Sequence, residues 1–258
     1  MADEEVLEVI RRAARDRIHG ATEIEEGLIK ALLTLRASWT ATQLSVGARL
    51  LAGGQPTMAP LARLAQSLGT SDLDDLQSLL ETRLSALRDA PEILVANALP
   101  WIERAVRVVS ISRSSAVAAA VEAAWSNGWK GTAVVLDGSS AGRGMDQTER
   151  LKRHGQAVSH PDASAPRWLD LPDTMVAVGA DAVAPSRFVN CIGTLMLLEL
   201  AAARNVPAIV IADGGKDVSD EILDRIIETM PLHHDNSGRE WSLFEVVPMG
   251  LVTARISD

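Results

Sequence analysis

The stretch VRVVSI, residues 106–111, is the point at which the sequence changes character. It is a continuous run of mostly β-branched apolar residues, without the alternation typical of a strand with one solvated face. Similar runs recur as TAVVLD (132–137), TMVAVG (174–179), PAIVIA (207–212) and LVTARI (251–256). Apolar segments of helical character lie between several of them, at residues 115–127 and 192–204. Continuous apolar strands that alternate with helices predict a Rossmann-like, doubly wound α/β fold with a mainly parallel sheet.

The sequence before residue 105 has helical spacing instead. Apolar residues recur three and four positions apart, first at Ile24, Leu28 and Leu32. The same spacing returns at Leu61, Leu64, Leu68, Leu76, Leu80, Leu84 and Leu87. Pro91 suits the first turn of one more helix. We therefore expect a helical N-terminal domain over residues 1–104 and a Rossmann-like α/β domain over residues 105–258.

The composition excludes several classes of protein. The chain has 258 residues, is 47% hydrophobic and 23% charged, and is therefore globular rather than disordered. Its net charge of −9 argues against a broad basic face for a nucleic-acid backbone. The single cysteine, Cys191, excludes an internal disulfide and a cysteine-rich zinc site. We find no signal peptide or membrane-spanning apolar run, so we expect a cytoplasmic protein. We also expect no metal and no cofactor.

Polar residues after the strand TMVAVG form the first candidate site. In a doubly wound sheet, ligands bind beyond the C-terminal ends of the strands, where the strand order reverses. Asp181 follows this strand directly and should project into that crevice, although an aspartate can also simply cap a turn. Asn190 and Thr194 flank the next expected helix start, where they could cap the helix or contact a ligand. Cys191 lies there too, either as a thiol with a lowered pKa or as a buried, inert cysteine.

Two other expected helix starts could hold an anion. Ser112, Arg113, Ser114 and Ser115 follow the first strand, and successive amides there, together with the Arg113 charge, favour an anion. The bare pattern is equally typical of an ordinary serine-rich helix start. The loop DGSSAGRG (137–144) carries a further cation, Arg143. His19, Gly20 and Ala21 precede a second helix, where they allow close backbone approach or merely form a tight turn. We expect the helix starts after Gly20, after Ser112 and at Ile192 to converge on one crevice.

At this point the sequence resembles a known family. The block VGADAVAPSRFVNCIGTLMLLELAAARNVPAIVIADGGK (178–216) resembles the signature of the initiation factor 2B family. RIHGATEI, SISRSSAVAAAVEAAWSNG and FEVVPMGLVTARIS resemble further family segments in the right order, so the resemblance spans nearly the whole chain. That family contains regulatory subunits of the eukaryotic translation factor, methylthioribose-1-phosphate isomerase and archaeal ribose-1,5-bisphosphate isomerase.

The resemblance implies roles for individual residues. Asp181 matches the catalytic aspartate of the isomerases, whereas Ser112 stands where they have a catalytic cysteine. His19 replaces a phosphate-binding arginine, and Cys191 replaces a lysine. Asn190, Gly193, Thr194 and Lys216 retain the family pattern. Residues 137–140 lack the arginine of the matching family segment. The binding frame is thus largely kept, and part of the isomerase chemistry is changed.

These matches leave three hypotheses. In the first, the protein is an isomerase that converts a phosphorylated pentose from aldose to ketose, with Asp181 moving a proton and Ser112 a poorer partner than a thiol. In the second, it is a regulatory subunit whose pocket senses a sugar phosphate or nucleotide. In the third, the α/β face only mediates assembly. The expected partners are a phosphorylated sugar or nucleotide and a second copy of the chain. The segment 192–203 is more apolar than one sheet face requires and suggests a homodimer.

Overall fold

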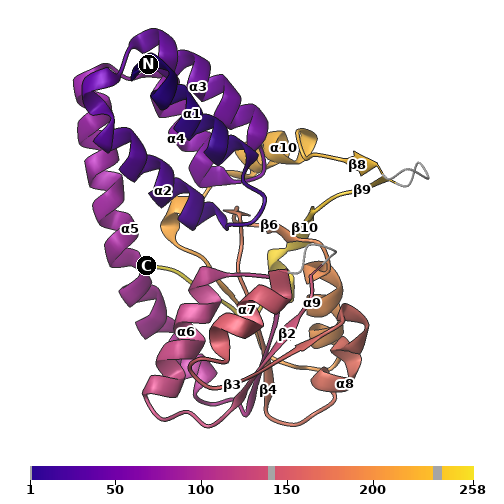
Figure 1. Cartoon of the computed structure of the whole chain (residues 1–258). Coiled ribbons are helices and arrows are strands. Elements are labelled where there is room, and N and C mark those ends of the chain that lie inside the picture. The colour runs from indigo at the N-terminus through magenta and orange to yellow at the C-terminus, as the bar shows by residue number, and fades with distance from the viewer. Residues whose placement is uncertain (1, 139–142, 235–239) are drawn as a thin grey trace. The chain divides into compact units, whose positions relative to one another are not determined.

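The computed structural model describes residues 2–138, 143–234 and 240–258. The chain forms two compact units, Met1–Ala90 and Pro91–Asp258. Figure 1 shows the helices of the first unit and the sheet of the second, and we describe each unit by itself.

The first unit is entirely helical in its described residues. Its helices are α1 (Ala2–Arg15), α2 (Ala21–Thr34), the short η1 (Arg36–Ser38), α3 (Ala41–Gly54), α4 (Ala59–Thr70) and the first part of α5 (Leu73–Ile102). The leucines at helical spacing are buried, among them Leu28, Leu32, Leu61 and Leu80. A capping box starts α3, because the Thr40 hydroxyl accepts a hydrogen bond from the Gln43 amide at 3.3 Å and Gln43 Oε1 accepts one from the Thr40 amide at 2.9 Å. The helical N-terminal region is thus confirmed.

Helix α5 departs from the prediction at Pro91. The proline does not begin a new helix, because α5 continues through Pro91 and Pro100 to Ile102. Each proline lacks an amide proton and so removes one helical hydrogen bond, but the buried side chains on both sides hold the helix together. The division between the two compact units falls at Ala90 and Pro91, inside α5. The domain boundary at residue 104 stays a prediction, and it lies two residues after the end of α5.

The second unit is built on a six-stranded sheet, and the predicted fold is confirmed. Its strands are β1 (Arg107–Ile111), β2 (Thr132–Leu136), β3 (Gln156–His160), β4 (Thr174–Val178), β7 (Ala208–Ile211) and β11 (Ala254–Ile256). Their spatial order is β11-β7-β4-β1-β2-β3, and every pair is parallel. Five of the strands match the apolar runs of the sequence. The sequence analysis missed β3, because QAVSH lies at the sheet edge and is only partly buried.

Helices cover both faces of this sheet. Alternate strand residues such as Val108, Val135 and Ile209 pack on one side with α6 (Ser115–Ser126) and the second part of α5. Val109 and Val134 point to the other side, where α8 (Ala165–Leu169) and α9 (Thr194–Ala203) pack. Burial on both faces explains why the strands are continuously apolar. Helix α7 (Arg143–Leu151) follows β2 and packs against β2 and β3.

A second, antiparallel sheet follows β4, and the sequence analysis did not predict it. Its strands β5 (Ala182–Val183), β6 (Arg187–Cys191) and β10 (Phe244–Pro248) have the order β10-β6-β5. A separate pair is formed by β8 (His233–His234) and β9 (Glu240–Trp241). The remaining elements are η2 (Asp162–Ser164), η3 (Gly214–Lys216), α10 (Asp220–Glu228) and η4 (Met249–Leu251).

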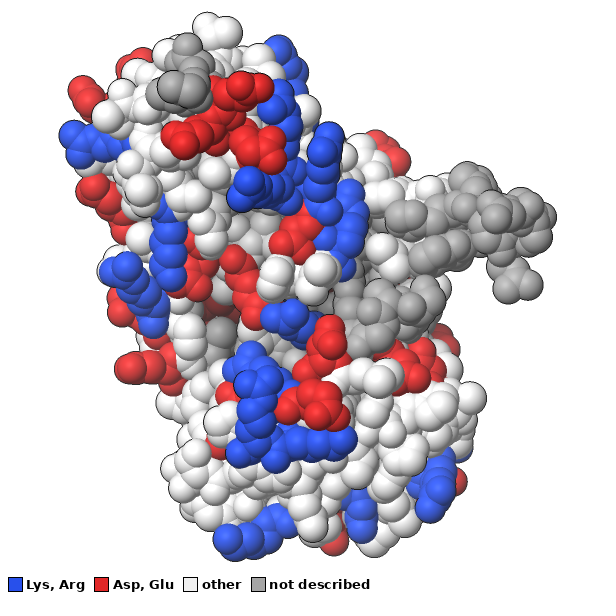
Figure 2. Space-filling model, viewed as in Figure 1, with Lys and Arg blue, Asp and Glu red and all other residues white. Residues whose placement is uncertain are grey.

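Opposite charges lie next to one another on the face of the molecule seen in Figure 2. On α7, Lys152 Nζ lies 2.7 Å from Glu149 Oε1. Arg150 Nε lies 2.7 Å from Glu122 Oε1 on α6. These pairs neutralise much of the charge locally. No helix in the described part of the chain is both long enough and apolar enough to cross a membrane.

Candidate functional site

The strand order places a topological switch point between β1 and β4. From β1 the chain moves outward through β2 and β3 on one side, and then through β4, β7 and β11 on the other. In such sheets the crevice at the C-terminal ends of the two central strands is the usual ligand site. Ser112 directly follows β1, and Asp181 lies three residues after the end of β4. The topology therefore brings the two predicted catalytic residues to the two sides of the switch point.

Ser112 has an unusual backbone conformation. Its φ of 59° lies in the left-handed region, which residues other than glycine rarely adopt. The residue is only 3% exposed, and its amide donates a hydrogen bond to the Leu136 carbonyl at 2.9 Å. Gly138 packs against it so closely that a Cβ at residue 138 would lie 2.4 Å from the Ser112 Cβ. The ends of β1 and β2 thus fix the backbone of Ser112.

Asp181 and Cys191 lie close together beside Ser112. The half-buried Asp181 donates its backbone amide to the Val189 carbonyl of β6 at 2.8 Å. Burial, together with the negative charges of Asp181 and Glu245, raises the pKa of the Cys191 thiol from 9.0 to about 12. Hydrogen bonds from the side chains of Thr194 and Ser112 oppose this rise in pKa but do not cancel it. Cys191 lies in β6 rather than at a helix start, so the prediction of a helix-lowered pKa is wrong and the buried alternative holds.

The start of α9 differs from the predicted one. Its N-cap is Gly193, with a φ of 95°, so of the two alternatives for Asn190 the capping of this helix does not hold. Asn190 lies in β6 and donates its amide Nδ2 to Thr194 Oγ1 at 3.0 Å, and that hydroxyl donates to the Cys191 carbonyl at 2.7 Å. The φ of Gly193 favours glycine, and a Cβ there would also lie 2.7 Å from Ile111 Cδ1, at the end of β1.

A carboxylate that the sequence analysis missed already occupies the first amides of α9. Glu245 Oε1, from β10, accepts a hydrogen bond from the Leu195 amide at 2.8 Å. Burial raises the pKa of Glu245, and hydrogen bonds from the backbones of Leu195, Gly193 and Thr194 act against that rise. The one sequence signal for this role was an acidic residue inside the otherwise apolar run FEVV. The anion site expected at this helix start is therefore filled by the protein itself.

The start of α6 is capped by a neutral side chain. Ser114 is the N-cap, and its hydroxyl accepts a hydrogen bond from the Val117 amide at 3.3 Å. Ser115 is the first residue of α6, and Arg113, which precedes the N-cap Ser114, is half-buried. Gly179, which follows β4, lies so close that a Cβ there would be 2.6 Å from Ser114 Oγ. This helix start thus lies at the switch point itself.

Gln147 of α7 also reaches this helix start. Its Nε2 donates to the Ser114 carbonyl at 3.0 Å, whereas its buried Oε1 has no hydrogen-bond partner in the described structure. A lone glutamine in an amphipathic helix carried no sequence signal for such a position.

Lys216 supplies a buried cation at the same edge of the sheet. It ends η3, shortly after the C-terminal end of β7, and it is only 7% exposed. No hydrogen bond or ion pair of its ammonium group occurs within residues 2–138, 143–234 and 240–258. The next residue, Asp217, forms a parallel bridge with Val183, two residues after Asp181. Lys216 is therefore tied to the segment that carries Asp181.

For two groups of predicted residues, the described structure does not test a place in this site. His19, Gly20 and Ala21 belong to the first unit, where Gly20 is the N-cap of α2. His19 is exposed, and its Nδ1 lies 2.7 Å from Asp16 Oδ2. Their convergence with the other helix starts stays a prediction. Arg143 begins α7, and the serines at 139 and 140 lie outside the described residues.

Comparison with known proteins then decides the family. Residues 3–228 match the model of the initiation factor 2 subunit family. The chain belongs to this family. No curated protein sequence matches the chain significantly.

Several solved structures share the fold of this chain. The translation initiation factor eIF-2B of Pyrococcus horikoshii OT3 aligns with a TM-score of 0.85 and 22% identity, covering 98% of this chain and 94% of that one. The tetrameric eIF2B-beta2-delta2 complex of C. thermophilum aligns with a TM-score of 0.77 and 15% identity, covering 98% of this chain and 90% of that one. The 5-methylthioribose 1-phosphate isomerase of Pyrococcus horikoshii OT3 aligns with a TM-score of 0.67 and 18% identity, covering 98% of this chain and 82% of that one. At these identities the likeness establishes the fold alone.

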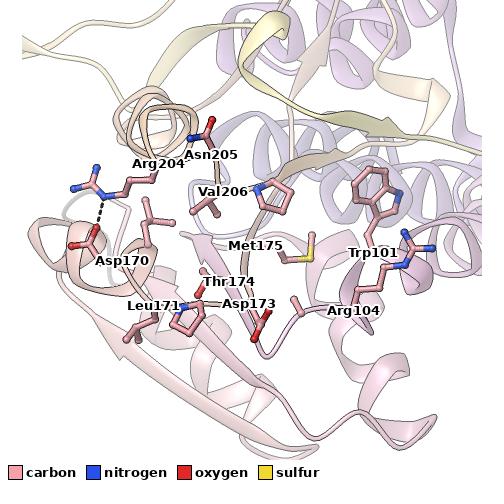
Figure 3. Close-up of a pocket in the computed structure, with 14 residues that line it drawn as sticks. Trp101, Arg104, Asp170, Leu171, Asp173, Thr174, Met175, Arg204, Asn205 and Val206 are labelled. Carbon is pink, nitrogen blue, oxygen red and sulfur yellow. Dashed lines mark hydrogen bonds and ion pairs between the residues drawn. The ribbon is translucent and has the colours of Figure 1, made fainter.

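A separate pocket of about 660 Å³ lies at the opposite edge of the main sheet (Figure 3). It lies at the N-terminal ends of β4 and β7, with Trp101 and Arg104 on one side. On the other side Arg204 Nε lies 2.6 Å from Asp170 Oδ1. None of the predicted site residues lines this pocket. No group of three or more His, Cys, Asp or Glu that could hold a metal ion occurs in the described segments.

Proposed function

We propose that this member of the initiation factor 2 subunit family binds a sugar phosphate at the β1/β4 switch point and isomerises a phosphorylated pentose from aldose 1-phosphate to ketose phosphate. The observation that carries the proposal is the placement of Asp181 and Ser112 on the two sides of that switch point. Two hydrogen-bonding side chains of different acidity at the central crevice are what a proton-transfer site requires.

The phosphate is proposed to bind at the start of α6. The free amides of a helix N-terminus attract an anion, and Arg113 adds a positive charge beside them. Lys216 supports an anionic ligand, because a largely buried lysine whose ammonium group has no partner within the described residues gains from a bound anion. His19, Gly20 and Ala21 are proposed, by resemblance, to complete the site.

The isomerisation needs no external oxidant. The bond between C1 and the ring oxygen opens, the C2 hydroxyl becomes a carbonyl, and one hydrogen moves from C2 to C1. The proton that leaves the C2 hydroxyl balances the proton gained by the ring oxygen. Asp181 is proposed to take the proton from C2 and return it to C1, and the Ser112 hydroxyl to assist the transfer between the oxygens. Proton transfer of this kind typically contributes about 10²–10⁴-fold.

A second candidate function is that of a non-catalytic regulatory subunit. Ser112 favours it, because a serine is a weaker acid and base than the cysteine that the resemblance leads one to expect. In this case the same crevice senses a sugar phosphate or nucleotide without converting it. Both candidate functions predict that the crevice binds the sugar phosphate, but only the isomerase predicts that the sugar phosphate is converted.

The test is calorimetry with ribose 1-phosphate, 5-methylthioribose 1-phosphate and adenosine monophosphate, followed by proton NMR of the sugar for ketose formation. Asp181→Asn should abolish turnover and retain binding, because it removes the base and keeps the shape. Lys216→Met should weaken binding at least tenfold, and Lys130→Met, which removes an exposed lysine, should not. Binding without turnover would establish the regulatory function. No binding of any of these compounds below millimolar concentration would reject the site.

We also propose that the protein is a cytoplasmic homodimer that associates through its α/β unit. Helix α9 presents Met196, which is 36% exposed, and the half-buried Leu195 and Leu200. Light scattering at micromolar concentration should give twice the monomer mass, and a monomer would refute the proposal.

A further inference from the structure

The separate cavity at the N-terminal ends of β4 and β7 has the size and lining of a small-molecule site. Its volume of about 660 Å³ lies within the range of roughly 300–1,000 Å³ that is usual for ligand pockets. All of its lining residues belong to the second unit. The apolar side chains of Met175 and Val206 lie between a wall that carries Trp101 and a wall that carries Arg204 (Figure 3). The cavity therefore offers both apolar and charged contacts to a ligand.

Backbone hydrogen bonds fix the segments that surround this cavity. The Asp173 carbonyl accepts hydrogen bonds from the amides of Val106 at 2.7 Å and Arg107 at 3.2 Å, at the start of β1. On the opposite wall, the Asn205 amide donates to the Ala202 carbonyl at 3.1 Å, which closes the end of α9. Asp173 and Asn205 have left-handed φ values of 55° and 56°, which aspartate and asparagine tolerate better than most residues do. The cavity is thus preformed, so a ligand would not have to order it.

Two opposite charges in the lining have no partner. Neither the Arg104 guanidinium group nor the Asp173 carboxylate forms a hydrogen bond or ion pair within residues 2–138, 143–234 and 240–258, and both side chains are exposed. The other two charged residues of the lining, Asp170 and Arg204, are already paired with each other. A ligand of one charge sign, such as a sugar phosphate, therefore meets a repelling group as well as an attracting one. A zwitterion can instead form a charge-assisted hydrogen bond with each of the two unpaired groups.

Trp101 offers a surface for the apolar part of such a ligand. It packs against the apolar cluster that joins α5 to the sheet, yet its side chain is only partly buried. It shares its wall of the cavity with Arg104 (Figure 3). Aromatic rings bury a large apolar area and pack on one another in stacked or edge-to-face arrangements. The lining thus combines a cation, an anion and an aromatic ring in one preformed space.

We infer that this cavity is a second ligand site, which binds a free α-amino acid with an aromatic side chain. The carboxylate of the ligand pairs with Arg104, its ammonium group pairs with Asp173, and its ring packs on Trp101. The inference does not depend on the proposed isomerase function, because the two sites share no residue.

The experiment is calorimetry on the full chain with L-phenylalanine, L-tryptophan and three analogues of L-phenylalanine that each lack one group. Hydrocinnamate lacks the ammonium group, phenethylamine lacks the carboxylate and L-alanine lacks the ring. The wild-type protein should bind the two aromatic amino acids with submillimolar Kd. Each analogue should bind about tenfold more weakly, because a hydrogen bond to a charged group or the burial of a ring typically contributes at least this factor.

Two variants assign the charged contacts to residues. Arg104→Gln should weaken the binding of L-phenylalanine about tenfold and leave the weaker binding of phenethylamine unchanged. Asp173→Asn keeps a residue that tolerates the left-handed backbone, and it should weaken L-phenylalanine equally and leave hydrocinnamate unchanged. Arg153→Gln, which removes an exposed arginine outside the cavity, and Lys216→Met, which alters the proposed isomerase site, should both bind L-phenylalanine like the wild type.

The outcomes decide the inference separately from the proposed function. Equal affinity for L-phenylalanine and hydrocinnamate would identify a simple anion site and overturn the inference. Loss of L-phenylalanine binding in Lys216→Met would place the amino acid in the isomerase crevice and would also overturn it. No binding of either aromatic amino acid at millimolar concentration would reject the second site and leave the proposed function intact. The comparison of the analogues uses the wild-type protein, so a folding defect in a variant would not remove the test.

Discussion

Glu245 makes the stability of the protein depend on pH. Burial raises its pKa above the ordinary value of 4.5, and the nearby charge of Glu199 acts in the same direction. The folded state therefore binds the proton more tightly than the unfolded state does. The contribution of this group to stability is fully present below pH 4.5 and is lost as the pH rises through the folded pKa.

The corresponding prediction concerns Glu245→Gln, which does not titrate. The free energy of unfolding of the variant, relative to wild type, should increase between pH 4.5 and pH 7. Urea unfolding of both proteins at several pH values measures this difference, with Glu228→Gln as the control for loss of one exposed charge. A difference that stays constant, or that decreases with pH, would show that the folded state does not raise this pKa.

Cys191 should be chemically silent in the folded protein. Its pKa is raised from 9.0 to about 12, and a shift of three units lowers the thiolate fraction at neutral pH about 1,000-fold. Because the chain has one cysteine, thiol labelling reports this residue alone. Labelling with a disulfide reagent at pH 7.5 should be slow in buffer and complete within minutes in guanidinium chloride. Rapid labelling of the folded protein would contradict the buried position.

At the residue scale, the sequence predicted where two of the candidate site residues lie in the fold. The positions of Ser112, directly after β1, and of Asp181, three residues after β4, were predictable, because polar residues that follow apolar strands of a parallel sheet lie at its C-terminal edge. Glu245 was not, since its partners in α9 are 50 residues away in the sequence. The left-handed conformation of Ser112 was not predictable either, because serine has no local preference for a positive φ.

At the scale of elements, a buried ion pair joins α2 to α5 within the first unit. Glu25 is only 3% exposed, and its two oxygens accept hydrogen bonds from Arg83 Nε and a terminal nitrogen, each at 2.8 Å. Removal of one partner leaves a buried charge without compensation, which typically costs about 3–5 kcal/mol. Arg83→Ala should lower the free energy of unfolding by this amount, as measured in urea.

The control for that measurement lies on the same helix. Arg88→Ala removes an exposed arginine and should change stability by less than about 0.5 kcal/mol. Simultaneous replacement of Glu25 and Arg83 by leucine should recover much of the loss, because no buried charge then remains. If Arg83→Ala and Arg88→Ala had equal effects, the ion pair would contribute nothing to the packing of α2 on α5.

The sequence predicted those elements whose side chains repeat regularly. The leucine-rich helices follow from their periodicity, and the five strands follow from continuous apolar runs of strand length. Helix α5 was divided at Pro91 in the prediction, because a local rule for proline cannot include the burial of Leu87 and Leu94 on either side. Strand β6 was read as the approach to a helix, because its pairing with β10 joins residues that are more than 50 positions apart.

At the scale of the whole molecule, the second half of α5 belongs to the core of the α/β unit. Leu94, Ala98 and Ile102 pack with Val108 and Val121 in one apolar cluster. Residues 91–104 therefore contribute to the stability of this unit, although the change of sequence character near residue 105 suggests a boundary there. The structure thus predicts that the smallest stable α/β fragment begins at residue 91, whereas the sequence pattern predicts that it begins at residue 105.

Two fragments distinguish these boundaries, one of residues 91–258 and one of residues 105–258. The shorter fragment exposes the surface that Leu94 and Ile102 cover, and burial of such a side chain stabilises a protein by roughly 1.5–3 kcal/mol. We expect the fragment 105–258 to be less stable than the fragment 91–258 by about 3–6 kcal/mol in urea unfolding, or to be insoluble. Leu94→Ala in the longer fragment should reproduce part of this loss, whereas Ile93→Ala, which truncates a side chain that is 47% exposed, should not. Equal stability of the two fragments would instead support a boundary at residue 104, because the helix would then add nothing to the core of the sheet.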